Sequence, residues 1–306
     1  MARQIGGLAA RLEYSATAAL VFGLRRLPWP RAVRAGARLA RFAMALDRVN
    51  RPIALRNLEI AFPETGVGRR LEILRSSYEN WGRMVAEWTH FEELGPHNVD
   101  RYVSYEGWSH FEKAKKLSAG RGILVLTAHF GNFELQALAF SLQGEPLAIV
   151  QRPVRNPLID RQVQQARVRF GNLVVARKRA AMRMRRLLRE DWMVAVALDL
   201  DVRRGIFVKF FSLAAATSDG LARLSMATGA SVLPAFIVRQ GDGLTHRTVF
   251  LPPVEVRRGG DHRSAVAENT QRFASIIEEM IRRHPDHWNW IHRRWKTRPP
   301  GERRFY

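Results

Sequence analysis

The sequence predicts an α/β protein, with a mostly parallel sheet flanked by helices and a helical N-terminal region. Three observations support this. From Gly122 onward, short β-rich runs alternate with helical stretches. In the first hundred residues, apolar positions recur instead at spacings of three and four. The 306 residues, 46% of them hydrophobic, are enough to bury a substantial core. We therefore expect a helical region over residues 1–100 and an α/β domain over residues 101–306.

The N-terminal region should contain two long helices, over Arg31–Leu46 and Arg69–Phe91. The second helix shows its apolar face at Leu71, Leu74, Tyr78, Trp81, Val85 and Trp88. Prolines lie between these helical segments and interrupt them. An alternating pattern begins at Tyr102–Tyr105 and indicates the first strand.

The segment Tyr14–Leu24 precedes these helices and is apolar, but it is shorter than the roughly 18 to 20 residues that span a bilayer. It also lacks a convincing signal-peptide cleavage site. The surrounding cationic and aromatic residues are Arg11, Arg25, Arg26, Trp29, Arg31 and Arg34. This pattern fits a helix lying in the headgroup plane of a membrane. It also fits a first core helix, and the two interpretations are compatible.

The α/β region is expected to alternate strands and helices. The strands are predicted at Ile123–Thr127, Leu147–Val150, Leu173–Val175, Met193–Leu198 and Val232–Val238. The helices are predicted at Asn132–Leu142, Pro157–Arg169, Ala181–Arg189, Asp219–Thr228 and Ser264–Arg283. Thr248–Val256 is predicted as an edge strand, because Pro252 and Pro253 are tolerated only at an edge.

The charge balance indicates an anionic partner. There are 50 Lys and Arg residues against 28 Asp and Glu residues, a net charge of +22. A GC-rich genome accounts for part of the arginine excess. The remainder favours nucleic acid, a phospholipid surface or an acidic protein. Cysteine is absent, which excludes disulfides, thiolate metal sites and a cysteine nucleophile.

His129 is the main candidate for catalysis. It follows the run Ile123–Thr127, at the carboxyl end of a predicted strand, where ligands collect in open α/β sheets. Gly131 gives the turn its conformational freedom, and Asn132 is a plausible helix N-cap. Such a turn would fold the imidazole over Glu134. A carboxylate on one ring nitrogen leaves the other free to accept a proton. A structural histidine is the alternative.

Five blocks in order resemble the lipid A biosynthesis acyltransferase family, the lauroyl and myristoyl transferases, and their relatives that act on phosphatidylinositol mannosides. "TAHFGNFE" resembles the H-x4-D/E block of glycerolipid-type acyltransferases. The other blocks are "LRNLEIAFPE", "IVQRPVRNPLID", "ALDLDVRRGIFVKFF" and "HPDHWNWIHRRWKTRP". The resemblance spans most of the chain, and it implies a fold like that of the glycerolipid acyltransferases.

The resemblance implies transfer of a fatty acyl chain from acyl carrier protein or acyl-CoA to a hydroxyl of a membrane glycolipid, such as a lipid A precursor. By position, His129 would be the base and Glu134 its partner. Arg152 would contact a phosphate or the developing oxyanion. Asp199 would have a supporting role near the histidine, and Asn156 a polar contact in the same pocket. A hydrophobic channel should hold the acyl chain.

The loop "FFSLAAATSDG" departs from the family pattern, in which glycine and then a proline-alanine and a threonine usually follow the paired phenylalanines. Here Ser212 and Ala214 replace small or rigid residues, whereas Thr217 and Gly220 match. Leu200 also stands where a polar residue is common. These changes concern the presumed acceptor side, so they affect the identity of the glycolipid more than the chemistry.

The C-terminal segment "HWNWIHRRWKTRPPGERR" interleaves tryptophans with arginines. It has three interpretations: a platform for single-stranded nucleic acid, a patch facing a membrane or carrier protein, or tryptophans anchored in the core. The basic segment Arg177–Glu190 is expected to be an amphipathic helix. Its cationic face would be solvated or would receive a carrier protein. The histidines are not in an H-E-x-x-H frame, so no metal or other cofactor is expected.

Together these observations predict an O-acyltransferase that is peripheral on the cytoplasmic side of a bacterial inner membrane. Its partners would be an acyl carrier protein or acyl-CoA donor, a glycolipid acceptor and an anionic membrane surface, without nucleic acid. Two alternatives are a membrane-associated scaffold that has lost catalysis and a basic nucleic-acid-binding protein. The first would explain the altered loop, and the second would explain only the charge.

Overall fold

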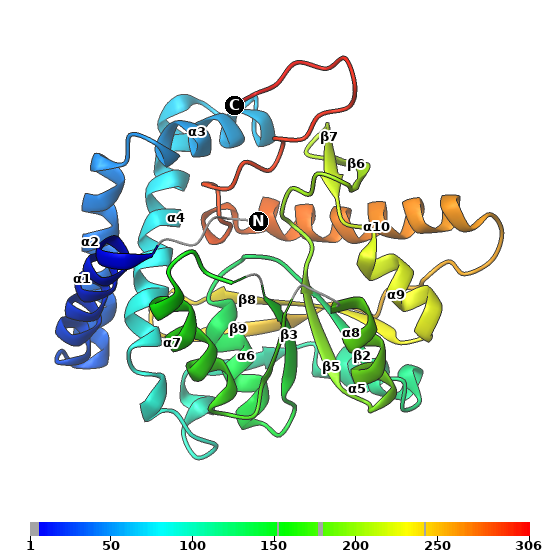
Figure 1. Ribbon diagram of the computed structural model, residues 1–306, viewed down its shortest axis with the longest axis horizontal. Coiled ribbons are helices and arrows are strands. Elements are labelled where there is room, and N and C mark those ends of the chain that lie inside the picture. Colours follow the sequence, from blue (N-terminus) through cyan, green and yellow to red (C-terminus); the bar gives the residue numbers. More distant parts are fainter. Residues whose placement is uncertain (1–5, 152, 177–179, 242) are drawn as a thin grey trace.

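The computed structural model describes residues 6–151, 153–176, 180–241 and 243–306. Its main strands are β1 (Val103–Glu106), β2 (Ile123–Thr127), β3 (Leu147–Gln151), β4 (Leu173–Ala176), β5 (Met193–Ala197), β8 (Ser231–Arg239) and β9 (His246–Phe250). They form one sheet in the order β1-β9-β8-β2-β5-β3-β4 (Figure 1). All neighbours in it are parallel except β8 and β9. The predicted α/β class, with a mostly parallel sheet, is confirmed.

The helices before the sheet are α1 (Gly7–Arg25), α2 (Trp29–Leu46), α3 (Asn50–Ala61) and α4 (Val67–Trp88). Those that flank it are α5 (Trp108–Ser118), α6 (Phe133–Leu142), α7 (Pro157–Val168), α8 (Ala180–Arg189), α9 (Gly220–Thr228) and α10 (His262–Arg283). A separate antiparallel hairpin consists of β6 (Ile206–Phe210) and β7 (Leu213–Thr217). The apolar pattern did not predict α3 and α5.

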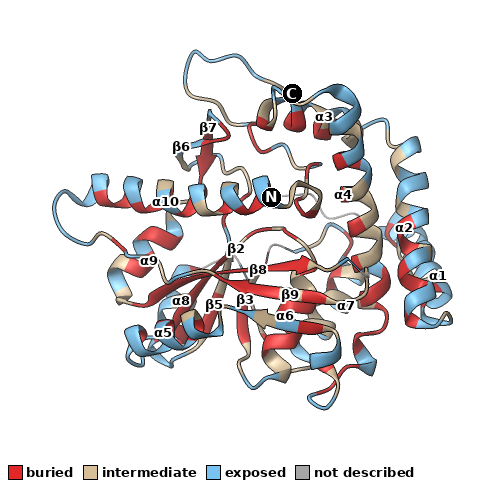
Figure 2. Cartoon of the chain, turned by 180° about the vertical axis from the view of Figure 1, so that it is seen from behind, coloured by how far each residue is buried: buried red, intermediate tan, exposed pale blue. Residues whose placement is uncertain are grey.

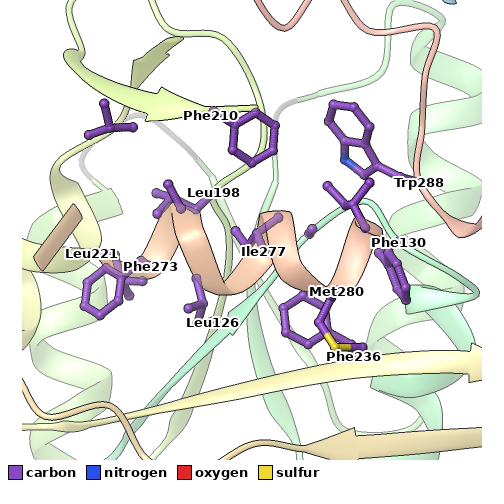
Figure 3. Close-up of a cluster of buried hydrophobic side chains, with 14 of the residues drawn as sticks. Leu126, Phe130, Leu198, Phe210, Leu221, Phe236, Phe273, Ile277, Met280 and Trp288 are labelled. Atoms are coloured by element: carbon purple, nitrogen blue, oxygen red, sulfur yellow. The ribbon is translucent and has the colours of Figure 1, made fainter. Parts of the chain in front are cut away.

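The central strands bury both faces, as parallel strands between helices must. In β2, Leu124 and Leu126 pack on the side of α8 and α10, whereas Ile123 and Val125 pack on the side of α5 and α6. On the first side, α10 lays Phe273, Ile277 and Met280 over the sheet (Figure 3). The alternation of side chains along each strand therefore builds two cores around one sheet.

The strand predicted at Thr248–Val256 differs from the prediction in two ways. It ends at Phe250, before the two prolines, and it is not at an edge. β9 lies between β8, its antiparallel partner, and β1, which is parallel to it and forms the edge. The prolines fall in the connection to α10, between the hydrogen bond from Leu251 N–H to the Pro234 carbonyl and the isolated β-bridge of Val254 with Val232.

The N-terminal helices pack closely on one another through two glycines. A Cβ on Gly82 of α4 would lie 2.2 Å from the carbonyl oxygen of Gly36 of α2, and a Cβ on Gly36 would lie 2.3 Å from that of Gly82. Trp29, expected near a membrane interface, is instead 6% exposed and stacks on Tyr102 at 4.4 Å between ring centroids. Within the described residues, no helix combines the length and apolar character needed to cross a bilayer.

Candidate active site

The site lies where β2 and β5, neighbours in the sheet, end together. These strands are paired in register up to Thr127 and Ala197. His129 and Asp199 each follow two residues later, so both side chains are at the carboxyl edge of the sheet. This is the edge at which open α/β folds bind their ligands.

The carboxylate of Asp199 bonds His129 through both oxygens. Its Oδ1 is 3.0 Å from Nδ1 of the ring, and its Oδ2 accepts the backbone N–H of His129 at 3.0 Å. Oδ2 also accepts Nε1–H of Trp288 at 2.9 Å. The Asp199 side chain is 1% exposed, whereas that of His129 is 29% exposed. A substrate can therefore reach the imidazole ring but not the carboxylate that supports it.

This environment sets the charge of both groups. Burial disfavours the imidazolium, but the charge of Asp199 and its hydrogen bond outweigh burial and raise the pKa of His129. Burial likewise disfavours the ionised carboxylate, but His129, Trp288 and the backbone N–H hold the pKa of Asp199 below its ordinary value. An ionised Asp199 fixes the proton on Nδ1, which leaves Nε2 as the basic nitrogen.

Glu134 does not occupy the expected position beside the ring. Its carboxylate, in the first turn of α6, is paired with both Nε and Nη2 of Arg167, with the Nε to Oε2 distance 2.9 Å. Its charge still favours the imidazolium of His129, without a hydrogen bond between them. The bond that was predicted for Glu134 is made by Asp199, which comes from a strand that is distant in sequence but adjacent in the sheet.

Arg167 connects Glu134 to the segment that follows β3. Its Nη1 donates to Oε1 of Gln151 at 2.6 Å, and Nε2 of Gln151 donates to Asp160 at 2.9 Å. Asp160 also accepts the backbone N–H of Val154 at 2.8 Å. Arg152, the predicted phosphate or oxyanion contact, lies outside the described residues. Gln151 before it and Val154 two residues after it belong to this network. A narrow cavity beside the Glu134–Arg167 pair is lined largely by apolar residues of α4, α6 and α7, among them Trp88, Leu138 and Ala166.

Asn156 is fully engaged elsewhere, not in a pocket with His129. Its Oδ1 caps α7 by accepting the N–H of Leu158 at 3.0 Å. Its Nδ2 donates to the carbonyl oxygen of Ala10 at 2.9 Å and to Glu13 at 3.1 Å. These bonds tie α7 to α1, so the polar character of Asn156 serves packing between helices.

The loop after His129 is held at each residue. Phe130 forms an isolated β-bridge with Trp288, and the N–H of Gly131 donates to the carbonyl of His287 at 2.8 Å. Gly131 has a φ of +57°, and a Cβ there would lie 2.0 Å from the carbonyl oxygen of Ile237. Only glycine fits such a conformation and approach. Asn132 caps α6 through the N–H of Leu135 at 3.0 Å, as expected.

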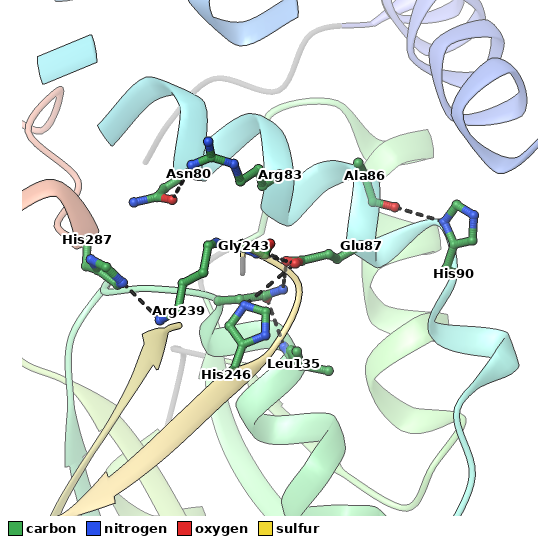
Figure 4. A network of polar contacts seen from close by, with 11 residues as sticks. Asn80, Arg83, Ala86, Glu87, His90, Leu135, Arg239, Gly243, His246 and His287 are labelled. Carbon is green, nitrogen blue, oxygen red and sulfur yellow. Dashed lines mark hydrogen bonds and ion pairs between the residues drawn. The ribbon is translucent and has the colours of Figure 1, made fainter. Parts of the chain in front are cut away.

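Behind this loop lies a buried polar network (Figure 4). Glu87 of α4, fully buried, accepts Nδ2–H of Asn132 at 2.7 Å and pairs with both Nη groups of Arg239. The backbone N–H of Arg239 donates to Nε2 of His287 at 3.0 Å. His246 lies beside Glu87, its Nε2 3.6 Å from Oε1. The network links the N-terminal helices, β8 and the C-terminal segment to the loop that carries His129.

The C-terminal tryptophans are core residues. Trp288, Trp290 and Trp295 are each at most 1% exposed, and Trp288 and Trp290 pack edge to face at 4.7 Å. Among the three interpretations of this segment, the structural one is therefore confirmed for the tryptophans. Their rings are not available to stack on bases or to lie in a membrane interface.

The C-terminal segment also binds the turn after β5, which contains Asp201. Asp201 accepts the N–H and the hydroxyl of Thr297, both at 3.0 Å, and its own N–H donates to Nε2 of His292 at 2.9 Å. The fully buried Arg294 donates to the carbonyl of Ala216 at 2.9 Å. The described residues contain no group of three or more His, Asp or Glu side chains placed to hold a metal ion.

Comparison with known proteins shows the family of the chain. Residues 9–297 match the family described as bacterial lipid A biosynthesis acyltransferase. The chain belongs to this family. It is 32% identical to the lipid A biosynthesis lauroyltransferase of Escherichia coli (strain K12), with 90% of this chain and 89% of the relative covered. It is 28% identical to the palmitoleoyltransferase of the same organism, with 92% and 90% covered, and 27% identical to the myristoyltransferase, with 87% and 81% covered.

Three residues at the site were not predicted from the sequence. Arg167 and Glu87 lie in predicted helices without a motif of their own, and Trp288 is one of several tryptophans in the C-terminal segment. Each acts through a contact that spans 33 or more positions in the chain. Sequence spacing gives no signal for contacts of this kind.

Proposed function

We propose that this protein is an O-acyltransferase that moves a fatty acyl chain from a thioester to a hydroxyl group of a lipid A precursor. One observation carries the proposal: a partly exposed imidazole whose Nδ1 is bound by a buried carboxylate, at the carboxyl edge of the sheet. In a member of this family, such a pair is suited to take a proton from a hydroxyl. The acceptor class comes from the names of the relatives, which all refer to lipid A.

In the proposed mechanism, Nε2 of His129 removes the proton of the acceptor hydroxyl as its oxygen attacks the thioester carbon. The carbonyl becomes a tetrahedral oxyanion. Collapse forms the ester and breaks the carbon–sulfur bond, and the imidazolium returns its proton to the departing thiolate. Asp199 holds Nδ1–H throughout and stabilises the imidazolium.

Arg152 is proposed to meet either the oxyanion or an acceptor phosphate. A fixed donor at an oxyanion is typically worth about 3 to 4 kcal/mol. Support comes from its neighbour Gln151, which Arg167 and Asp160 hold in place. Glu134 is then proposed to act by orienting Arg167 and, through it, the segment that carries Arg152. The cavity beside this pair has a volume of only about 10 Å³, so admitting the acyl chain there would require its lining side chains to move apart.

The donor is proposed to be acyl carrier protein or acyl-CoA, both anionic. The basic face of α8 is suited to either donor, because it exposes four arginines: Arg183, Arg185, Arg186 and Arg189. Electrostatic attraction of this kind increases the rate of encounter more than the affinity.

We also propose that the protein binds the cytoplasmic surface of a bacterial inner membrane through α1 and α2. Along α2 and just beyond it, an apolar row with spacings of three, four and three is exposed: Leu39 47%, Phe42 65%, Leu46 64% and Val49 67%. Arg38, Arg41 and Arg48 lie exposed beside this row. In α1, Leu8 and Leu12 are 72% and 63% exposed. Figure 2 shows that much of the surface of α1 and α2 is exposed. Apolar side chains flanked by arginines suit an anionic bilayer surface.

The enzyme assay offers purified protein a labelled acyl carrier protein or acyl-CoA, over a lipid A precursor in detergent. We expect a labelled lipid with wild type and none with His129→Ala. Folded wild type that transfers from neither donor would refute the acyltransferase proposal and favour a scaffold.

Membrane binding is measured separately, by flotation with vesicles that contain anionic phospholipid. Phe42→Asp should reduce flotation strongly. Leu117→Asp changes a residue of similar exposure, 54%, on α5, and should float as wild type does. Equal flotation of both variants would refute the assignment of this surface.

A further inference from the structure

Trp288 contacts the carboxylate that supports His129, and it comes from the C-terminal segment. Its Nε1–H donates to Oδ2 of Asp199 at 2.9 Å, and the ring is 1% exposed. The ring packs edge to face against Trp290 at 4.7 Å and Phe210 at 5.9 Å between centroids. Its own carbonyl accepts the hydroxyl of Ser77 at 2.8 Å. The indole is thus fixed by packing and by its backbone.

The two oxygens of Asp199 have different tasks. Oδ2 takes both rigid donors, the indole N–H of Trp288 and the backbone N–H of His129. Oδ1 is left for Nδ1 of the imidazole, 3.0 Å away. Because two fixed donors hold Oδ2, the carboxylate cannot rotate without losing a hydrogen bond to an ionised group in a buried site.

We infer that Trp288 is a positioning residue of the proposed reaction: its indole N–H holds the plane of the Asp199 carboxylate, so that Oδ1 stays aligned with His129. This inference rests on the proposed acyl transfer. The inference concerns the indole N–H and not the bulk of the ring. Its effect on the reaction can therefore be tested separately from the packing of Trp288 in the core.

The test compares Trp288→Phe with Trp290→Phe. Both tryptophans are 1% exposed, are neighbours in space and donate one hydrogen bond from the indole N–H. Trp290 donates to the carbonyl of Pro285 at 2.6 Å, in a part-buried bond away from Asp199. The measurements are kcat, KM, the pH profile of kcat/KM and thermal unfolding. The other charged groups that act on His129, namely Glu134 and Arg167, are unchanged in both variants. His292, whose pKa burial lowers to about 4, is unchanged as well.

We expect kcat of Trp288→Phe to fall by about tenfold or more, the factor for one hydrogen bond to a charged group, with KM unchanged. The acid limb of its pH profile should move to higher pH, because Asp199 keeps one donor fewer and attracts the imidazolium more strongly. Trp290→Phe should lose stability to a similar extent but keep the wild-type kcat and profile.

The inference would be overturned if Trp288→Phe had the same kcat and pH profile as Trp290→Phe. The acyltransferase proposal would then still stand, because it fails only if the wild-type protein is inactive. If Trp288→Phe does not fold, benzothienylalanine at position 288 replaces the indole N–H by sulfur at nearly constant shape. The same outcomes then decide.

Discussion

His129 and Asp199 occupy matching positions on two paired strands, each two residues beyond the registered pair Thr127 and Ala197. They are 70 residues apart in the chain. Strand register, rather than local spacing, therefore sets the 3.0 Å contact between Nδ1 and the carboxylate. Because β2 and β5 are neighbours in the middle of the sheet, the support for the base is part of the strand pairing itself.

The contact predicts the effect of Asp199→Asn. An amide at this position can turn its NH2 group toward Nδ1 and shift the ring proton to Nε2, which is then no longer a base. We expect kcat to fall roughly 10³- to 10⁴-fold, as for the equivalent change in a serine protease triad, with little change in KM. A loss of less than tenfold in steady-state assays would contradict this role.

Glu134→Gln should have a smaller effect, because Glu134 bonds Arg167 instead of the ring. We expect a loss of about 10- to 100-fold, the usual cost of disturbing a group that orients another. Arg167→Gln should lose a similar factor, and the double variant little more than either, because the pair acts as one unit. Additive losses in the double variant would show that the two residues act separately.

The pH profile follows from the pKa of His129. The base must be neutral, and Asp199 raises the pKa of His129 above its usual 6.5 despite burial. Activity should therefore fall as pH decreases, with the midpoint of the acid limb of kcat/KM above 6.5. In Asp199→Asn, the carboxylate charge that outweighs burial is lost, so the pKa of His129 should fall. The acid limb of any residual activity should then lie at lower pH. A wild-type limb below 6.5 would contradict the assigned environment.

The sequence was sufficient for the parts of the fold that depend on local pattern. Apolar β-rich runs predicted the central strands, and they also predicted that His129 follows the end of a strand, where the structure places it. The partner of His129 was misassigned because Glu134 is near in sequence, whereas Asp199 becomes near only through strand pairing. The contact of Trp288 with Asp199 and the position of β9 within the sheet were not predicted for the same reason: both depend on contacts between distant segments.

Ser212→Gly should stabilise the hairpin between β6 and β7. Phe211 and Ser212 form its turn with φ of 48° and 68°, a left-handed conformation that costs a residue with a side chain roughly 1 to 2 kcal/mol. Glycine removes this cost but also gives the unfolded chain more freedom. We expect a net gain of about 0.5 kcal/mol in urea unfolding, with Ser212→Ala near wild type. If the Ser212→Gly variant were less stable than the Ser212→Ala variant, the backbone at position 212 would not be strained.

Gly82→Ala should destabilise the packing of α2 on α4. The added Cβ would lie 2.2 Å from the carbonyl oxygen of Gly36 and 2.5 Å from Cβ of Ala40. The first of these is a backbone atom and cannot move without shifting α2. Overpacking of this kind costs roughly 1 to 3 kcal/mol, which exceeds the gain of about 1 kcal/mol from replacing a helical glycine.

Gly68→Ala is the matched control for this prediction. It lies in the same helix, and a Cβ there meets nothing within 4 Å, so the helix-propensity gain should appear without the clash. Urea unfolding should show Gly82→Ala less stable than wild type and Gly68→Ala equal or more stable. Because α2 carries the proposed membrane-binding row, Gly82→Ala should also weaken vesicle flotation while leaving acyl transfer in detergent largely intact. A stable Gly82→Ala protein would mean that the two helices can separate without cost.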